Sequence, residues 1–270
     1  MKNLFFLCCF FTSSLSAQLL LPVRGTVPSG EESASKQFRD PFAAFLNPAA
    51  LCGQRSAIAL RSERAFLLKE LSLFQLQALW AQEHAAIGFQ VQSLGHRAWR
   101  SYAAGLQYAR ELGQVTIGIS VQYTGVPAGA EGTDGTVHAT AGILFPVSPS
   151  LHSGLRVSNF LGGRLLKTPA FRLARELEWS WGYTVSATLW MGLALLKTEG
   201  RPVRLSAEIV YQPVQSLLTK AGINSQTRSP WVGAGWQKGK LQVFAACALH
   251  PEAGLTPSLH LIFSFKAEAE

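Results

Sequence analysis

The sequence predicts an all-β fold, a transmembrane antiparallel β-barrel of about 12–14 strands with a short N-terminal plug-like segment. Three observations predict it. After residue 17 no stretch is apolar enough over the roughly 20 residues that a spanning helix needs, although mean hydropathy is +0.16 and charged residues make up only 15%. Apolar and polar residues alternate in many short segments, and turn-forming residues separate many of these segments.

The clearest alternation lies between Gln114 and Tyr123. Because side chains alternate across a strand, the two sets of residues in this stretch lie on opposite faces. The apolar face holds Val115, Ile117, Ile119, Val121 and Tyr123, and the other face holds Gln114, Thr116, Gly118, Ser120 and Gln122. We expect the apolar face to contact lipid and the small, polar face to line a wet or plugged lumen.

The same pattern recurs in about fourteen segments, an even number, most of them close to the roughly 9–11 residues of a tilted spanning strand. Turn chemistry such as Glu111-Leu112-Gly113 and Lys238-Gly239-Lys240 separates many of them, and the gaps 125–135 and 160–176 are candidate external loops. The segments are 56–65, 71–82, 85–94, 101–108, 114–123, 136–146, 151–159, 179–189, 191–197, 203–212, 217–226, 230–238, 241–249 and 258–265.

A soluble β-sandwich is the alternative fold, since its strands also alternate. Two features favour the barrel: the polar faces are rich in Gly, Ser, Thr and Gln, and aromatic residues gather near segment ends, as in the interfacial girdles of membrane barrels. These aromatics are Trp80, Trp99, Tyr102, Tyr108, Tyr123, Trp179, Trp190, Tyr211 and Trp231. The last segment ends in Phe263-Ser264-Phe265, which resembles the aromatic-ended terminal strand of outer-membrane barrels.

The first residues predict a secretory signal peptide. Lys2 gives a positive start, Leu4 to Phe11 is apolar, and Ala17 marks the expected cleavage site. The apolar run is too short for a membrane anchor, and Cys8 and Cys9 lack the small residues of a lipoprotein cleavage site. We therefore expect a Gram-negative outer-membrane location. Cys52 and Cys247 remain after cleavage, which leaves room for one disulfide but does not indicate it.

The net charge of +8 could indicate a nucleic-acid ligand. The basic residues are scattered rather than clustered, and a signal peptide removes the chain from the cytoplasm. We therefore expect no nucleic-acid partner. A basic barrel rim facing outer-membrane lipid, lipopolysaccharide phosphates or an anionic partner agrees better with this distribution.

The residues before the first strand predict a compact element in the barrel mouth. Asp40 can cap a short helix that starts at Pro41, and Asn47-Pro48 would end it. We expect a signal peptide at 1–17, a plug or hatch-like segment at 18–55, the barrel at 56–266 and a short tail at 267–270. A structural role for the Asn47-Pro48 turn is favoured over ligand binding.

This element carries a resemblance to a known family. The pattern Asp-x-x-Ala-x-x-x-Asn-Pro-Ala-x-Leu resembles the N-terminal signature of PorV/PorQ-type barrels, within the wider FadL-like class of long-chain fatty-acid transporters. The matching residues are Asp40, Ala43, Asn47, Pro48, Ala49 and Leu51. The resemblance implies a barrel of about fourteen strands with an N-terminal segment in the lumen. It also implies either a role in type IX protein secretion or passage of hydrophobic molecules.

No catalytic or metal site is predicted. Histidines lie near hydroxyl residues at His138/Thr140, His152/Ser153 and His260/Ser258. Adjacent strand residues point to opposite faces, and no carboxylate in the last segment could orient His260. The histidines show no metal-ligand spacing, and nothing indicates a cofactor. Candidate lumen residues are Arg156, Arg204, Glu208 and His260, whose charges would pair across the lumen or line a pathway.

Three functions remain open. The leading hypothesis is a non-enzymatic, PorV/PorQ-like protein that assists export or surface attachment of other proteins by binding them. The second is a FadL-like channel for hydrophobic small molecules. The third is an outer-membrane hydrolase. An apolar path towards a plug would favour transport, and a filled lumen with an apolar loop rim would favour partner binding.

Overall fold

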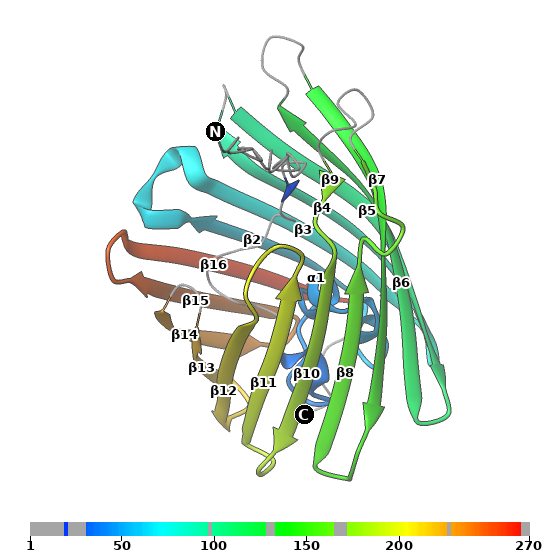
Figure 1. The fold of residues 1–270 in the computed structure, drawn as a ribbon. Coiled ribbons are helices and arrows are strands. Elements are labelled where there is room, and N and C mark those ends of the chain that lie inside the picture. Colours follow the sequence, from blue (N-terminus) through cyan, green and yellow to red (C-terminus); the bar gives the residue numbers. More distant parts are fainter. Residues whose placement is uncertain are drawn as a thin grey trace, which may run out of the picture.

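The structure is a computed structural model, and it describes residues 19–20, 31–96, 99–127, 133–164, 172–225 and 228–265 (Figure 1). Fourteen strands close into one barrel, each antiparallel to its neighbours. They are β2 (Ala57–Arg64), β3 (Ser72–Ala81), β4 (Ala85–His96), β5 (Trp99–Leu112), β6 (Val115–Pro127), β7 (Thr133–Pro146), β8 (Leu151–Ser158), β10 (Glu176–Thr184), β11 (Leu189–Thr198), β12 (Arg204–Val214), β13 (Leu217–Asn224), β14 (Ser229–Lys238), β15 (Leu241–His250) and β16 (Gly254–Ser264).

The barrel closes through pairing of its first and last strands. β16 pairs with β2 from Ser258↔Glu63 to Ser264↔Ala57. In lipid an unpaired backbone amide or carbonyl costs several kcal/mol, and closure removes the sheet edges where such groups would lie. The predicted all-β transmembrane barrel is confirmed, at the upper end of the predicted strand number.

The predicted alternation separates a lipid face from a lumen face. β2 alternates buried and exposed residues along its whole length. In the segment that showed the pattern most clearly, Ile117, Ile119 and Val121 are exposed outward, whereas Thr116 and Ser120 are buried in the lumen. Both faces are therefore as predicted for this strand.

The predicted segment 179–189 proves to be two elements. β10 ends at Thr184, residues 185–188 form a turn closed by Val185 N–H donating to Leu189 O (3.0 Å), and Leu189 begins β11. The apolar positions of this turn continue the spacing of the strand before it. Alternation alone therefore concealed the turn, because it contains neither Gly nor Pro.

Two aromatics of the predicted girdle lie in the lumen. Trp80, Trp99, Tyr102, Tyr108, Tyr123, Trp179 and Tyr211 are exposed on the outer face, as expected. Trp190 and Trp231, however, are only 0% and 2% exposed. The alternation along β14 explains the position of Trp231: it lies on the same face of the strand as Gly233 and Gly235, and this face lines the lumen.

The two ends of the barrel differ in their connections. At one end tight turns such as 113–114, 215–216 and 239–240 join the strands; this is called the short-turn end. The other end carries the longer connections. Residues 65–71 contain η3 (Ala65–Leu67) and η4 (Lys69–Leu71), and residues 159–175 contain β9 (Arg172–Leu173). β9 pairs in parallel with β1 (Leu19–Leu20).

Residues 31–55, called the plug, enter the barrel before its first strand. They contain η1 (Glu31–Ala34), α1 (Ala43–Leu46) and η2 (Pro48–Leu51), which Figure 1 shows enclosed by the barrel wall. Within the described parts of the chain, no helix is long and apolar enough to cross a membrane. The predicted signal peptide (1–17) and tail (267–270) lie outside the described residues, and the described barrel runs from Ala57 to Ser264.

The plug sits near the short-turn end and packs against one side of the wall. Leu51 is fully buried against Leu79, Ala86 and Ala109, and burial of one such side chain contributes about 1.5–3 kcal/mol. From the wall, Gln107 Nε2 donates to Ala44 O (2.8 Å). η2 contacts β4 to β7, and η1 contacts β8, β10 and β11.

Asn47 is the fixed point of this packing. It ends α1, and its Oδ1 accepts from Ala49 N–H (3.0 Å) at the start of η2. Its Nδ2 donates to the wall carbonyls of Ile143 and Leu155 (both 3.4 Å). Gly142 lies directly beneath it, and a Cβ there would collide with Asn47 Oδ1. The wall therefore needs glycine at 142 for the turn to approach.

We predict that Gly142→Val loosens the plug. Overpacking at a tight contact costs about 1–3 kcal/mol, so the temperature at which the folded barrel loses its characteristic migration on SDS gels should fall. Ala141→Val, on the outer face of the same strand, is the matched control and should change little. Equal effects of the two variants would show that the turn does not depend on Gly142.

Candidate passage beside the plug

All six residues of the predicted plug motif are buried in the plug. Ala43 and Ala49 pack with Ala50 and Leu144 of the wall, while Asn47 and Leu51 hold the side described above. Asp40 Oδ1 accepts from Phe42 N–H (2.8 Å), so it caps the turn that leads into α1. The helix begins at Ala43 rather than at Pro41, two residues later than predicted.

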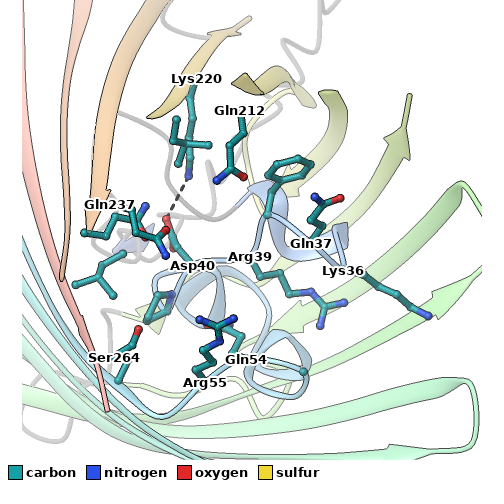
Figure 2. A pocket seen from close by; sticks show the side chains of 17 residues that line it. Lys36, Gln37, Arg39, Asp40, Gln54, Arg55, Gln212, Lys220, Gln237 and Ser264 are labelled. Carbon is teal, nitrogen blue, oxygen red and sulfur yellow. Dashed lines mark hydrogen bonds and ion pairs between the residues drawn. The ribbon is translucent and has the colours of Figure 1, made fainter. Parts of the chain in front are cut away.

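Asp40 also bridges the plug to the opposite wall. Its Oδ2 lies 3.3 Å from Lys220 Nζ on β13, and both side chains are buried. Figure 2 shows Lys220 reaching from the wall to Asp40. Breaking a buried ion pair is costly, so this contact helps to hold the two surfaces together.

A cavity separates the plug from the β12–β16 side of the wall. Its volume is about 290 Å³. The plug contributes residues 36–41 and 53–55, and the wall contributes residues from β2 and from β12 to β16, including Gln212, Lys220, Gln237 and Ser264 (Figure 2). η1 and η2 pack against β4 to β11, and this cavity lies on the other side of the plug. On that side Phe42 packs against Ala57, Ala59 and Ile262, and Phe38 packs against Val210.

An apolar column runs along the same wall from this cavity towards the longer connections. Trp231, Phe244, Ala246 and Ala248 form one buried cluster, and Leu218, which also lines the cavity, packs against it. The Phe244 ring lies across Gly233, where a Cβ would collide with it. Glycine in β14 thus lets the ring lie flat against the wall.

His260 and Lys220 connect the column to the plug. The His260 ring centroid lies 5.3 Å from that of Phe42 in the plug and 5.3 Å from that of Phe244 in the column. Lys220 Nζ lies 5.3 Å from the Phe244 centroid, within the range of a cation–π interaction. Phe42, His260 and the Asp40–Lys220 pair therefore stand between the column and the cavity.

The other predicted lumen residues lie elsewhere. On β8, Arg156 Nη2 donates to Glu178 Oε2 (2.9 Å) and Glu176 Oε2 (3.3 Å) of β10. Glu208 on β12 is buried on the lumen face opposite Gly192 and Gly222, and Arg204 is half-buried on the same strand. Among the described contacts of the four predicted residues, those of His260 alone reach the plug, at Phe42.

The histidine–hydroxyl pairs do not form an accessible nucleophilic site. Ser258 Oγ and His260 Nε2 are 3.0 Å apart, but both side chains are buried and two phenyl rings flank the imidazole. His138 Nε2 contacts Thr124 Oγ1 (3.0 Å) rather than Thr140. Cys52 and Cys247 are both free. Burial, assisted by Glu111, raises the pKa of the Cys52 thiol to about 11, so it stays protonated at neutral pH.

Sequence reasoning missed Lys220 and the lumen aromatics. Lys220 lies on the lumen face by its position in the predicted segment 217–226, and Trp231 lies on the same face of its strand as two glycines. Following parity strand by strand would have placed both residues inward. Nothing in the sequence indicates that Asp40 and Lys220 meet, because they are 180 residues apart.

Family models and curated proteins give no match to this chain. Solved structures do. The CymD monoaromatic hydrocarbon channel is 11% identical, with a TM-score of 0.60 and coverage of 85% of this chain and 94% of that chain. The Ralstonia pickettii toluene transporter TbuX has the same identity and TM-score, with coverage of 86% and 94%.

A Pseudomonas aeruginosa FadL homologue is also 11% identical, with a TM-score of 0.59 and coverage of 86% of this chain and 96% of that chain. These comparisons support the FadL-like part of the predicted resemblance, and the PorV/PorQ part stays a prediction. At this identity the shared property is the fold. The chain has the architecture of FadL-type outer-membrane barrels.

Proposed function

We propose that this protein is an outer-membrane channel that passes hydrophobic small molecules. The apolar column on β13 to β15, which reaches the cavity beside the plug through Leu218, carries the proposal. An apolar molecule that moves along aromatic and aliphatic side chains stays out of contact with water, which the hydrophobic effect favours. The resemblance in fold to a hydrocarbon channel and a toluene transporter supports it.

The route runs on the side of the lumen opposite the plug's main contacts. Cargo would follow Trp231 and Phe244, and then meet Phe42, His260 and the Asp40–Lys220 pair. Short turns mark the periplasmic end in barrels of this kind, so the cavity would be the periplasmic exit. Passage then requires the plug to shift on this side, while the hydrogen bonds of Asn47 to the opposite wall stay in place.

The hypothesis of type IX secretion gains less support. Leu67 and Leu68 on the β2–β3 connection are 59% and 49% exposed, and such leucines could bind a partner protein. The comparisons give this role no support. We expect deletion of the gene to leave the secreted proteome unchanged; loss of specific secreted proteins, reversed by the restored gene, would favour secretion over transport.

We predict that a charge in the column blocks uptake. Toluene uptake would be measured in cells that lack other hydrocarbon channels and express this protein. Phe244→Glu should reduce uptake several-fold, because cargo would have to pass a charged group in an apolar surface. Phe244→Leu keeps the surface apolar and should retain uptake. Equal uptake by cells with and without the protein would contradict the proposed function.

We predict that breaking the Asp40–Lys220 pair both opens the route and destabilises the barrel. Lys220→Met removes this cation from beside Asp40; loss of one partner of a buried pair costs up to about 3–5 kcal/mol, and the variant should raise toluene uptake and planar-bilayer conductance. The double variant Lys220→Met/Asp40→Asn also lacks the carboxylate. It should recover part of the stability, while toluene uptake should stay raised. Lys69→Met, which alters an exposed pair at 4.0 Å, is the control. Unchanged uptake by the Lys220→Met variant would show that the Asp40–Lys220 pair does not block the route.

A further inference from the structure

The cavity beside the plug has a charge that passage of hydrocarbons does not require. Among the described residues that line it, four carry a cationic side chain, Lys36, Arg39, Arg55 and Lys220, and one carries a carboxylate, Asp40. In Figure 2 Lys220 points to Asp40 from the wall, while the other three cations belong to the plug side. Like charges in a confined space repel one another, so the cavity favours entry of an anion.

Arg39 lies on the plug side of the cavity and makes one described hydrogen bond. Its Nη1 donates to Cys52 O (2.9 Å), and its buried Nε has no acceptor among the described residues. It forms no ion pair within the described part of the chain. Burial lowers the pKa of its guanidinium to about 10, although Cys52 and Glu111 raise it, so the group remains charged at neutral pH. A desolvated guanidinium of this kind attracts a carboxylate, which can accept two parallel hydrogen bonds from it.

The rest of the lining is amphipathic. Phe38, Leu218 and Ile262 supply apolar surface, and glutamine amides such as Gln237 and Gln242 supply neutral hydrogen-bonding groups. A volume of about 290 Å³ is at the lower end of the roughly 300–1,000 Å³ of small-molecule sites. The occupant is therefore compact, with an apolar body and a single charged head.

We infer that this cavity is a binding site for the carboxylate head of a compact amphipathic molecule, such as a single aromatic ring bearing one carboxylate. Arg39 and Lys36 would bind the carboxylate, and Leu218 and Phe38 would contact the apolar body. The role of the site in passage rests on the proposed function, because the apolar column delivers cargo to it. Binding itself does not depend on transport.

The test is calorimetric titration of the purified full-length barrel in detergent with benzoate, benzyl alcohol and inorganic phosphate. Benzoate should bind, and benzyl alcohol, of similar shape but without charge, should bind at least roughly tenfold more weakly, as expected for loss of one charged hydrogen bond. Phosphate should also bind more weakly than benzoate, because it lacks the apolar body. Phosphate binding as tight as benzoate would overturn the amphipathic site.

Variants assign the binding to the cavity. Arg39→Gln should weaken benzoate binding by roughly tenfold, and Lys36→Gln should weaken it less, because Lys36 is exposed. Lys238→Gln removes an exposed cation from the same end of the barrel, outside the cavity, and should leave binding unchanged. Unboiled migration on SDS gels would confirm that each variant is folded. Absence of benzoate binding, or equal weakening by Lys238→Gln, would overturn the inference.

Failure of this inference differs from failure of the proposed function. If toluene uptake requires Phe244 but benzoate does not bind, the channel stands and the anion site does not. If benzoate binds through Arg39 but cells with and without the protein take up toluene equally, the site stands without the channel.

Discussion

Pairing of backbone groups in a medium without water is the constraint on which the whole structure depends. It requires a closed sheet, and closure with fourteen strands sets the width of the lumen. Side chains fill the interior of barrels of about eight strands, whereas barrels of 16–18 strands leave an aqueous channel. A barrel between these sizes is too wide for its own side chains and narrow enough for one short segment to fill much of it. Residues 31–55 occupy this space.

The plug is held unevenly, and this unevenness generates the candidate route. On one side Asn47 and Leu51 make close contacts that need a glycine in the wall, and Gln107 adds a hydrogen bond. On the other side the Asp40–Lys220 pair and the Phe42–His260 contact lie beside a cavity, and Phe42 and Phe38 also pack against apolar residues of β2, β12 and β16. The cavity leaves room for local movement of the plug on one side, while the close contacts of Asn47 and Leu51 hold it on the other.

The sequence predicted the barrel because its main determinant is local. Alternation with period two indicates which face of each strand contacts lipid. In strands such as β2 and β6 it can be recognised without knowing which strands they pair with. Trp190 and Trp231 were misplaced because residue type was given more weight than parity. The merged segment 179–189 shows the converse limit, since its turn lacks Gly and Pro. The plug motif was visible, but its contact with Lys220 was not, because closure of the barrel creates that contact.

The pairing of β1 with β9 has a consequence for assembly. Leu19–Leu20 pair with a strand of the 159–175 connection, whereas the plug that follows packs near the opposite mouth, immediately before β2. The polypeptide thus contacts both mouths before its first wall strand begins. A sheet that closes around this segment avoids threading it through a finished cylinder. In that case β16 and β2 would pair last, after the other strands have formed around the luminal segment.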